Sequence, residues 1–359
     1  MTEKTKALIE KLINSRSLSV EEYEYLILNR DKDAFEMLRN EALRLRHEIY
    51  GKSVYIRGLI EISNICKNDC FYCGIRKSNK SCDRYRLTKE EILSCCENGY
   101  ELGFRTFVMQ GGEDAHFTDK YLCEIISEIK DRYPDCAVTL SLGERSKESY
   151  KRLFSAGADR YLLRHETADN EHYQRLHPEN LKLENRLKCL NDLKETGFQV
   201  GCGIMVGSPY QTEKTIAKDL KFIEEFKPDM CGIGPFIPHK DTPFKDMRQG
   251  TLELTCFLLS VIRIIRPDIL LPSTTALGTI EPDGREKGIL ASANVLMPNL
   301  SPVNVRNKYL LYNNKLNTGA ESAEKLDELK KRINAIGYEI VCDRGDIKKQ
   351  RKDETNGNI

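Results

Sequence analysis

The sequence predicts an α/β chain built as a (β/α)8 TIM barrel, with a helical extension before the barrel and a short helical segment after it. The chain has 359 residues, of which 40% are hydrophobic, and this is enough for one large core. Eight short apolar or β-branched runs follow one another from residue 54 onward, and amphipathic stretches of helical length separate most of them. An open, doubly wound sheet is the alternative, but its glycine fingerprint is missing after the first run.

The elements are expected in the following order. Residues 1–50 carry Leu, Glu and Arg at helical spacing and form the helical extension, with Ser19 as a helix cap. Residues 51–312 form the barrel and residues 313–343 the C-terminal helical segment, while the charged residues 344–359 are expected to be a disordered tail. The predicted strands are 56–63, 106–109, 137–142, 160–164, 199–205, 230–234, 269–273 and 293–297.

Helix signals stand between these strands. Thr88 and Glu91 form a capping box before an apolar run, and Ser146 begins a further helix. Gly197 ends the helix expected over 184–196. Later helices are expected over 212–226, 251–265 and 323–336. Because TIM barrels carry their active sites at the C-terminal ends of the strands, the residues that follow each strand are the candidates for function.

Charge and hydropathy exclude several functional classes. The chain has 56 Lys and Arg against 55 Asp and Glu, so no basic stripe for nucleic acid is expected. No apolar run approaches 18 residues, and Arg263 and Arg266 interrupt the longest one, so no membrane span is expected. The N-terminus lacks an apolar signal region and the 13 cysteines are odd in number. We therefore expect a cytoplasmic chain with reduced thiols, some of them bound to metal.

A C-x3-C-x2-C motif, formed by Cys66, Cys70 and Cys73, follows the first predicted strand. A structural zinc site is the plainer interpretation, but it would need a fourth ligand, and no second cysteine pair follows. Iron–sulfur clusters are held by cysteine thiolates, normally four, so three thiolates leave one iron open to a small molecule. The motif therefore favours a catalytic cluster. The other ten cysteines lack such spacing and are expected to be buried thiols.

Polar residues follow the next three strands. Glu113 comes after two glycines, which let a backbone approach a ligand closely, although a plain turn would look the same. Thr139 and Ser141 share one face of the third strand, where a barrel interior normally has branched apolar residues. Alternation also points Arg164 and Glu166 the same way. Such a pair binds a zwitterion or forms a salt bridge with itself.

With these residues placed, the sequence resembles the radical S-adenosylmethionine (SAM) enzymes, whose cysteine signature has an aromatic residue, here Tyr72, before its last cysteine. A closer resemblance, over about residues 40–312, is to the HydE family of FeFe-hydrogenase maturation enzymes. It is carried by the segments YIRGLIEISNICKNDCFYCGIR, TLSLGE, RYLLRHET, GIGPFIPHKDTP, STTALGTI and ANVLMPN. The resemblance implies a TIM barrel with one 4Fe-4S cluster and SAM as cofactors.

The resemblance also assigns roles to residues of this chain. The cluster would be held by Cys66, Cys70 and Cys73. SAM would be held by Tyr72, Gly112, Glu113, Ser141, Arg164, Glu166 and Arg186. The substrate cavity would be lined by Arg57, Thr139, Met230, Thr274, Thr275, Met297 and Tyr309. Some family members carry a second cluster on C-terminal cysteines, but residues 310–341 contain no cysteine here, so none is expected.

The function implied by the resemblance is anaerobic assembly of the hydrogenase H-cluster. Reductive cleavage of SAM would give a 5′-deoxyadenosyl radical that attacks the sulfur of a cysteine-bound iron carbonyl-cyanide precursor. The implied partners are an electron donor, a radical SAM tyrosine lyase and a scaffold GTPase, with neither nucleic acid nor membrane. One alternative is a radical SAM mutase or sulfur-insertion enzyme acting on an amino acid, as in methylornithine synthase or biotin synthase. Another is a non-catalytic iron–sulfur scaffold, which would need no polar groups inside the barrel.

Overall fold

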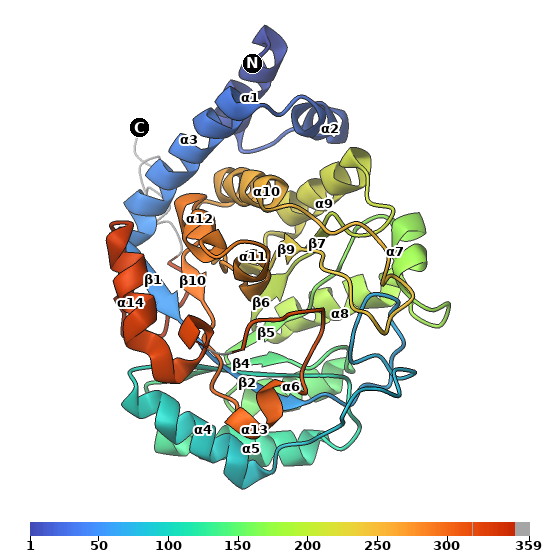
Figure 1. Ribbon diagram of the computed structural model, residues 1–359, viewed down its shortest axis with the longest axis vertical. Helices are drawn as coiled ribbons and strands as arrows, with labels where there is room; N and C mark the ends of the chain where they lie inside the picture. The colour runs from blue at the N-terminus through green and yellow to red at the C-terminus, as the bar shows by residue number, and fades with distance from the viewer. Residues whose placement is uncertain (318, 349–359) are drawn as a thin grey trace, which may run out of the picture.

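Residues 1–317 and 319–348 are described by a computed structural model, in which parallel strands form a central barrel surrounded by helices (Figure 1). Arg57 divides the first predicted strand into β1 (Ser53–Ile56) and β2 (Gly58–Ser63). The next strands begin at the predicted residues and pair in parallel, in chain order from β2 onward. They are β3 (Thr106–Gly111), β4 (Ala137–Ser141), β5 (Arg160–Leu162), β6 (Gln199–Cys202) and β8 (Met230–Cys231).

The barrel closes between β8 and β1. Leu270 forms a parallel bridge with Met230, and Pro272 forms one with Val295, so this segment takes the seventh strand position. It forms only single bridges, and Pro272 has no N–H to donate to a longer ladder. The eighth position is β10 (Val295–Leu296), which pairs with β1. β7 (Met205–Val206) and β9 (Gly234–Pro235) pair beyond β6 and β8. The predicted (β/α)8 barrel is therefore confirmed.

The helices that connect the strands cover the outside of the barrel (Figure 1). Thr88 and Glu91 make both hydrogen bonds of the predicted capping box at the start of α4 (Lys89–Glu101). Gly197 ends α8 (Leu183–Thr196) with a φ of 108°. The others are α5 (Asp119–Arg132), α6 (Lys147–Ser155), α7 (Asn170–Leu176), α9 (Glu213–Phe226), α10 (Leu252–Ile265), α11 (Thr275–Ile280), α12 (Gly284–Leu290) and α13 (Val303–Arg306).

The helical extension consists of α1 (Glu3–Ser15), α2 (Val20–Leu28) and α3 (Lys32–Tyr50). Ser19 caps α2 through a capping box with Glu22. α3 packs against α10 and α2 against α9, so the extension rests on the sixth and fifth helices of the barrel layer. The Tyr23 hydroxyl also donates to Glu224 of α9 at 2.9 Å. Figure 1 shows α1, α2 and the start of α3 projecting beyond the barrel.

The segment after the barrel contains one strand that the sequence did not predict. Its helical part is η1 (Gly319–Glu321), η2 (Ala323–Lys325) and α14 (Leu326–Ala335), so the expected helix begins with a 3-10 turn. β11 (Glu339–Val341) then pairs in parallel with β1, Ser53 lying opposite Glu339. Three residues with an acidic one among them give too short a pattern to indicate a strand.

The charged tail differs from its prediction. Disorder was expected from residue 344, but residues 344–348 pack against the starts of the barrel strands. Arg160, the first residue of β5, is fully buried and forms its ion pair with Asp346. Such a partner lowers the cost of burying a guanidinium, and a charge pattern read along the chain cannot show that the tail supplies it. The rest of the predicted tail, 349–359, lies outside the described residues.

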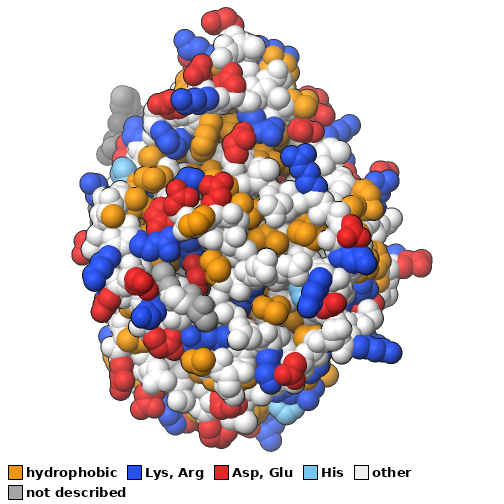
Figure 2. Space-filling view, in the orientation of Figure 1, with side chains coloured by type: hydrophobic (Ala, Val, Ile, Leu, Met, Phe, Trp, Pro, Cys, Tyr) orange, Lys and Arg blue, Asp and Glu red, His pale blue; other side chains and the backbone are white. Residues whose placement is uncertain are grey.

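The main core lies between the strands and the helices, and includes Ile60, Phe107, Val138, Leu190 and Ile262. Figure 2 shows basic and acidic side chains intermixed over the face drawn, with hydrophobic ones scattered among them. Among the described residues, no helix combines the length and the apolar character that crossing a membrane requires.

Candidate functional site

The three cysteines of the motif lie on the loop that follows β2, at the C-terminal end of the barrel. All three are half-buried free thiols. Burial, and next the neighbouring Cys66 thiolate, raise the pKa of Cys73 to about 12. Burial and then Cys73 likewise raise the pKa of Cys70. The sulfurs are therefore close enough to oppose one another's ionisation, and such a site favours a metal group that takes up thiolate charge.

The chemistry of this loop fits a cluster better than a single ion. Among the described residues, no three His, Cys, Asp or Glu side chains are grouped so that they could hold one metal ion. A structural zinc site would need a fourth ligand beside the three thiolates. A 4Fe-4S cluster is larger and is held by separate thiolates around it, so three thiols on one loop suit it.

Arg84 shapes the cysteine loop from its far end. Its guanidinium donates to the backbone carbonyls of Ile75 at 2.8 Å, Arg76 at 2.6 Å and Asn79 at 3.1 Å. Arg76 in turn pairs with Asp69, Nε to Oδ1, at 2.7 Å. The protein's own hydrogen bonds therefore set the path of this loop, which has no helix or strand from residue 64 to 84.

The Gly-Gly-Glu turn after β3 is joined to the cysteine loop. A Cβ on Gly112 would lie 2.3 Å from the Ile65 carbonyl oxygen and 2.8 Å from Cys66 Cβ, so only glycine fits there. Lys67 donates its backbone N–H to the Glu113 carbonyl at 3.0 Å, and its Nζ lies 3.1 Å from Glu113 Oε2. The structure therefore brings Gly112 and Glu113 beside the first cysteine of the motif.

Arg164, Glu166 and Arg186 form one cluster next to this turn. Arg164 Nη2 is 3.2 Å from Glu166 Oε2, an ion pair in which neither atom makes a hydrogen bond. Arg186 donates to the Arg164 carbonyl at 2.8 Å and to Glu144 Oε1 at 2.5 Å. The mutual salt bridge considered from the sequence is thus present, and it leaves buried hydrogen-bonding capacity for a polar ligand.

Arg164 and Glu166 lie together for a different reason from the one predicted. β5 ends at Leu162, so strand alternation does not orient Arg164 and Glu166. Glu166 instead has a φ of 64°, in the left-handed region that non-glycine residues rarely adopt. Its backbone N–H donates to the Gly203 carbonyl at 3.0 Å. Backbone strain of this kind is concentrated at ligand sites.

Tyr72 and Ser141 complete the predicted SAM set. The Tyr72 hydroxyl is 3.1 Å from His177 Nε2, and the two rings meet edge to face with centroids 5.4 Å apart. Burial lowers the pKa of His177 to about 3, so this imidazole is neutral. Burial, and next the Glu166 carboxylate, raise the pKa of Tyr72. Ser141 is the half-buried last residue of β4, opposite Gln110 of β3.

Arg57, Met230 and Met297 lie deeper in the barrel. Arg57 Nη1 is 2.9 Å from Met230 Sδ, and Met297 packs on the small apolar cluster that contains Met230. Burial, and next the Arg160 charge, lower the pKa of Arg57. In the described part of the chain, no carboxylate lies within ion-pairing distance of its guanidinium. A buried cation without an acid partner is able to bind an anionic ligand.

The remaining residues predicted to line the cavity differ in whether their hydroxyl groups have hydrogen-bond partners. Thr139 and Thr274 have buried hydroxyls with no hydrogen-bond partner among the described residues. Thr275 Oγ1 accepts from Arg285 Nη2 at 2.8 Å, and Arg285 forms a buried ion pair with Glu321. The structure therefore provides two open hydroxyls and one occupied one. Tyr309 accepts a hydrogen bond from Gln110 Nε2 at 3.3 Å.

Sequence reasoning missed a buried ion pair beside Tyr309. Glu61 on β2 is fully buried and pairs with Lys315, whose Nζ lies 5.2 Å from the centre of the Tyr309 ring. Asn299 Nδ2 also donates to Glu61 at 2.9 Å. A lone acid inside an apolar strand was the signal for Glu61, because burying a charge requires a partner. Lys315 stands in a loop and had no such signal.

A segment after the barrel crosses its mouth. Leu311 accepts at its carbonyl a hydrogen bond of 2.8 Å from the Gly74 N–H of the cysteine loop. Asn313 donates its backbone N–H to the Pro238 carbonyl at 3.1 Å. Lys315 then reaches Glu61 inside the barrel. We call residues 309–315 the crossing segment, and Figure 1 draws it in red in front of the strands.

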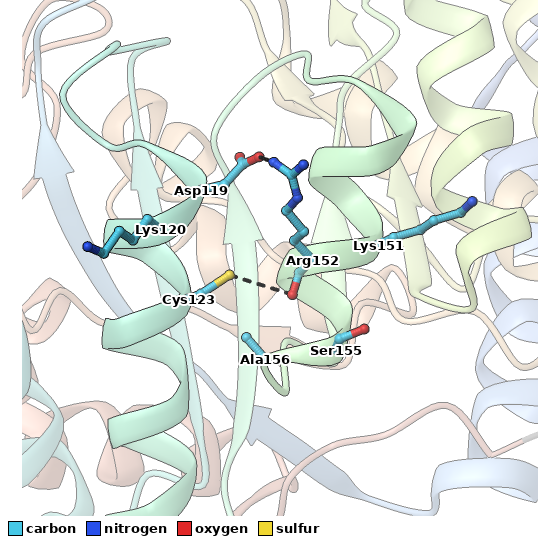
Figure 3. Close-up of a pocket in the computed structure, with 7 residues that line it drawn as sticks. All are labelled: Asp119, Lys120, Cys123, Lys151, Arg152, Ser155 and Ala156. Carbon is cyan, nitrogen blue, oxygen red and sulfur yellow. Dashed lines mark hydrogen bonds and ion pairs between the residues drawn. The ribbon is translucent and has the colours of Figure 1, made fainter.

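A surface groove between α5 and α6 lies apart from this site. It is lined by Asp119, Lys120, Cys123, Lys151, Arg152, Ser155 and Ala156 (Figure 3). Arg152 Nη1 lies 3.1 Å from Asp119 Oδ2, and the Cys123 thiol donates to the Arg152 carbonyl at 3.6 Å. None of the predicted site residues lines this groove, so it is not part of the candidate site.

Comparison with known proteins places the chain among radical SAM enzymes. The family described as the Radical SAM superfamily matches residues 60–223. The chain is 42% identical to the FeFe hydrogenase maturase subunit HydE of Thermotoga maritima, over 89% of this chain and 91% of the relative. It is 27% identical to the 3-methylornithine synthase of Methanosarcina acetivorans, over 80% and 81%. It is 26% identical to the biotin synthase of Macrococcus caseolyticus, over 72% and 79%.

Two solved structures share the fold. Methylornithine synthase (PylB) matches with a TM-score of 0.82 at 24% identity, over 93% of this chain and 97% of that chain. HydG, a maturase of the FeFe-hydrogenase, matches with a TM-score of 0.78 at 23% identity, over 94% and 76%. Both likenesses support the barrel architecture.

Replacing Arg84 with Met should impair retention of the cluster. A hydrogen bond from a charged donor contributes about 1.5–3 kcal/mol, and the substitution removes several from the cysteine loop. Iron bound after anaerobic reconstitution should fall well below the about four atoms per chain expected of one 4Fe-4S cluster. Lys77→Met, which changes an exposed side chain of the same loop, is the control and should keep its iron. Equal iron in both variants would contradict this role of Arg84.

Proposed function

Because the chain belongs to the HydE family of radical SAM enzymes, which use a 4Fe-4S cluster and SAM, we propose that it acts on an organometallic precursor of the hydrogenase H-cluster. The observation that carries the proposal is the 42% identity to the maturase subunit HydE over 89% of the chain. The substrate we propose is a cysteine-bound iron carbonyl-cyanide species, whose sulfur is the atom attacked. When bound, the cluster and SAM supply the 5′-deoxyadenosyl radical for that attack.

The chain's own residues divide between the two ends of the cavity. Cys66, Cys70 and Cys73 would hold the cluster at the C-terminal end. Beside them, the SAM group is expected to be held by the backbone of the Gly-Gly-Glu turn and by Arg164 and Glu166. Together with the other predicted residues, the full set is Tyr72, Gly112, Glu113, Ser141, Arg164, Glu166 and Arg186. A zwitterion matches this set because it offers a carboxylate to a guanidinium and an ammonium to a carboxylate.

The substrate end is the deeper part of the barrel. Arg57 has no acid partner and supports the binding of an anionic ligand such as cyanide. Met230, 2.9 Å from Arg57, and Met297 surround it with soft, polarisable sulfur. The open hydroxyls of Thr139 and Thr274 add polar contacts. With Thr275 and Tyr309 these residues are the proposed lining, and a closed barrel keeps water away from a radical and an organometallic group.

Reduction of the cluster requires an electron donor. The basic side chains beside the cysteine loop support a donor with an acidic surface. Residues 65–84 and 237–250 together carry six exposed Lys or Arg against two exposed Asp, whereas the whole chain has a net charge of +1. The two loops adjoin, with the rings of Phe71 and Phe244 6.1 Å apart. An acidic one-electron carrier would be steered to this face beside the cluster.

Two further partners belong to the proposal. A radical SAM tyrosine lyase would supply the precursor, and a scaffold GTPase would receive the product. The cytoplasmic location expected from the sequence stays a prediction.

Anaerobic turnover tests the proposed substrate. The reconstituted enzyme is reduced and mixed with SAM and the cysteine-bound iron carbonyl-cyanide complex, and 5′-deoxyadenosine is measured. Formation that rises well above the rate without substrate supports the proposal. Formation that the complex leaves unchanged, but that lysine or another amino acid raises, would instead favour an amino-acid mutase.

Glu166→Ala should weaken SAM binding while the barrel stays folded. Loss of a charge-assisted hydrogen bond of about 1.5–3 kcal/mol corresponds to roughly a 10- to 100-fold loss of affinity. Equilibrium binding of SAM to protein with an intact cluster measures it. Glu179→Ala, on an exposed side chain, is the control. Unchanged affinity in Glu166→Ala would show that this carboxylate serves only as the partner of Arg164.

Met297→Ala should impair substrate turnover without impairing SAM cleavage. Met297 packs with Met230 in the deep part of the barrel, away from the proposed SAM residues. Productive turnover should therefore fall, whereas 5′-deoxyadenosine formed without substrate should stay near the parent rate. Met37→Ala, on the helical extension, controls for loss of a methionine. If both rates fall together in Met297→Ala, the proposed division of the cavity is wrong.

A further inference from the structure

The N-terminal end of the barrel is covered by the chain's own C-terminal residues. Asp346 Oδ1 accepts from Gln199 Nε2 at 3.0 Å, at the start of β6. The Arg344 carbonyl accepts from Thr106 Oγ1 at 2.7 Å, at the start of β3. Lys348 donates its backbone N–H to the Tyr50 hydroxyl at 3.3 Å, just before β1. We call residues 344–348 the floor segment, because they tie together the first residues of several strands.

Charge fixes the floor segment in place. Asp346 pairs with the fully buried Arg160 of β5. Arg344 Nη2 lies 2.8 Å from Asp159 Oδ1, and its Nε lies 2.9 Å from Asp346 Oδ2. Burial would raise the pKa of Asp346, but Arg160 and then Arg344 outweigh it and lower the pKa to about 2. The carboxylate is therefore ionised at neutral pH, and its attachment weakens only as the pH falls from about 3.8 towards 2.

Gly345 lets the segment enter the barrel. Its φ is 60°, and a Cβ there would lie 2.7 Å from Cγ of Tyr55. Its carbonyl oxygen thereby comes within 3.4 Å of Arg57 Nη2. On its other side Arg57 donates to Met230 Sδ at 2.9 Å. Both partners are uncharged, so they orient the guanidinium without forming an ion pair, and the Asp346 carboxylate only partly offsets the burial that lowers the pKa of Arg57.

We propose that the floor segment closes the reaction cavity from below and that Gly345 is a positioning residue for Arg57. The floor segment supplies a carboxylate in direct contact to Arg160 and only a carbonyl in direct contact to Arg57, so Arg57 remains without an ion-pair partner among the described residues. This inference rests on the proposed function in one respect, namely that Arg57 binds an anionic part of the substrate.

Hydrogen–deuterium exchange of the cofactor-free protein tests the floor. A chain that ends at Asp343 lacks the segment, and a chain that ends at Lys348 keeps it. Backbone amides at the starts of β1, β3, β5 and β6 should exchange several-fold faster in the shorter chain. They should exchange at the parent rate in the longer one. Equal exchange in the two chains overturns the proposal.

Azide binding, measured by calorimetry on the cofactor-free full chain, tests the positioning of Arg57. Gly345→Ala should weaken azide binding about tenfold because the new Cβ displaces the segment from Arg57. Gly337→Ala is the matched control, since Gly337 has a φ of 81° but no atom within 4 Å of a Cβ. Arg57→Met should abolish the binding. If the chain ending at Asp343 does not fold, the comparison of Gly345→Ala with Gly337→Ala still tests the proposal.

The outcomes separate this inference from the proposed function. Weaker azide binding in Gly345→Ala alone supports the positioning role, even if the organometallic complex is not turned over. Faster exchange without a change in azide affinity would make the segment a merely structural cover and overturns the proposal. Azide binding that survives in Arg57→Met also overturns it, because the anion would then bind elsewhere.

Discussion

Buried charge inside a closed barrel is the constraint on which the rest of this structure depends. Burying an ion away from water is costly, and a partner of opposite charge lowers that cost. Three of these partners come from residues that follow the last barrel strand. Lys315 pairs with Glu61, Glu321 with Arg285, and Asp346 with Arg160. The C-terminal segment therefore supplies charged partners to both ends of the barrel rather than being an appendage to it.

This arrangement also separates the two chemistries proposed for the cavity. At the C-terminal end, thiols, a glycine turn and the Arg164–Glu166 pair present groups that suit a metal cluster and a zwitterion. At the opposite end, the hydrogen bonds of Arg57 go to the uncharged Met230 sulfur and Gly345 carbonyl, and it forms no ion pair among the described residues. The ion pair of Glu61 and Lys315 lies beside Tyr309 and contributes no net charge. The barrel can thus offer a dipolar site at the Arg164–Glu166 pair and a cationic site at Arg57, because neither Glu166 nor Glu61 forms an ion pair with Arg57.

The features predicted from the sequence were those that depend on near neighbours in the chain. Thr88 and Glu91 cap a helix three residues apart, and the cysteines of the motif share one loop. β3 to β6 and β8 begin where apolar runs begin. What could not be predicted depends on distant residues. The pairing of β11 with β1 joins residues almost 300 apart in the chain, and nothing local marks Asp346 as the partner of Arg160. The sequence predicted that the side chains of Arg164 and Glu166 lie together. It did not predict the left-handed backbone of Glu166, because the prediction assumed the alternation of a strand.

The crossing segment has a consequence for how the enzyme is built. Leu311 is hydrogen-bonded to Gly74, one residue after the last cysteine of the motif. The cysteine loop lies in the first quarter of the chain, whereas its cover lies in the last. During synthesis the ribosome therefore releases the thiols well before the residues that close over them. Until then the cysteine loop lacks the hydrogen bond that the Leu311 carbonyl accepts from Gly74.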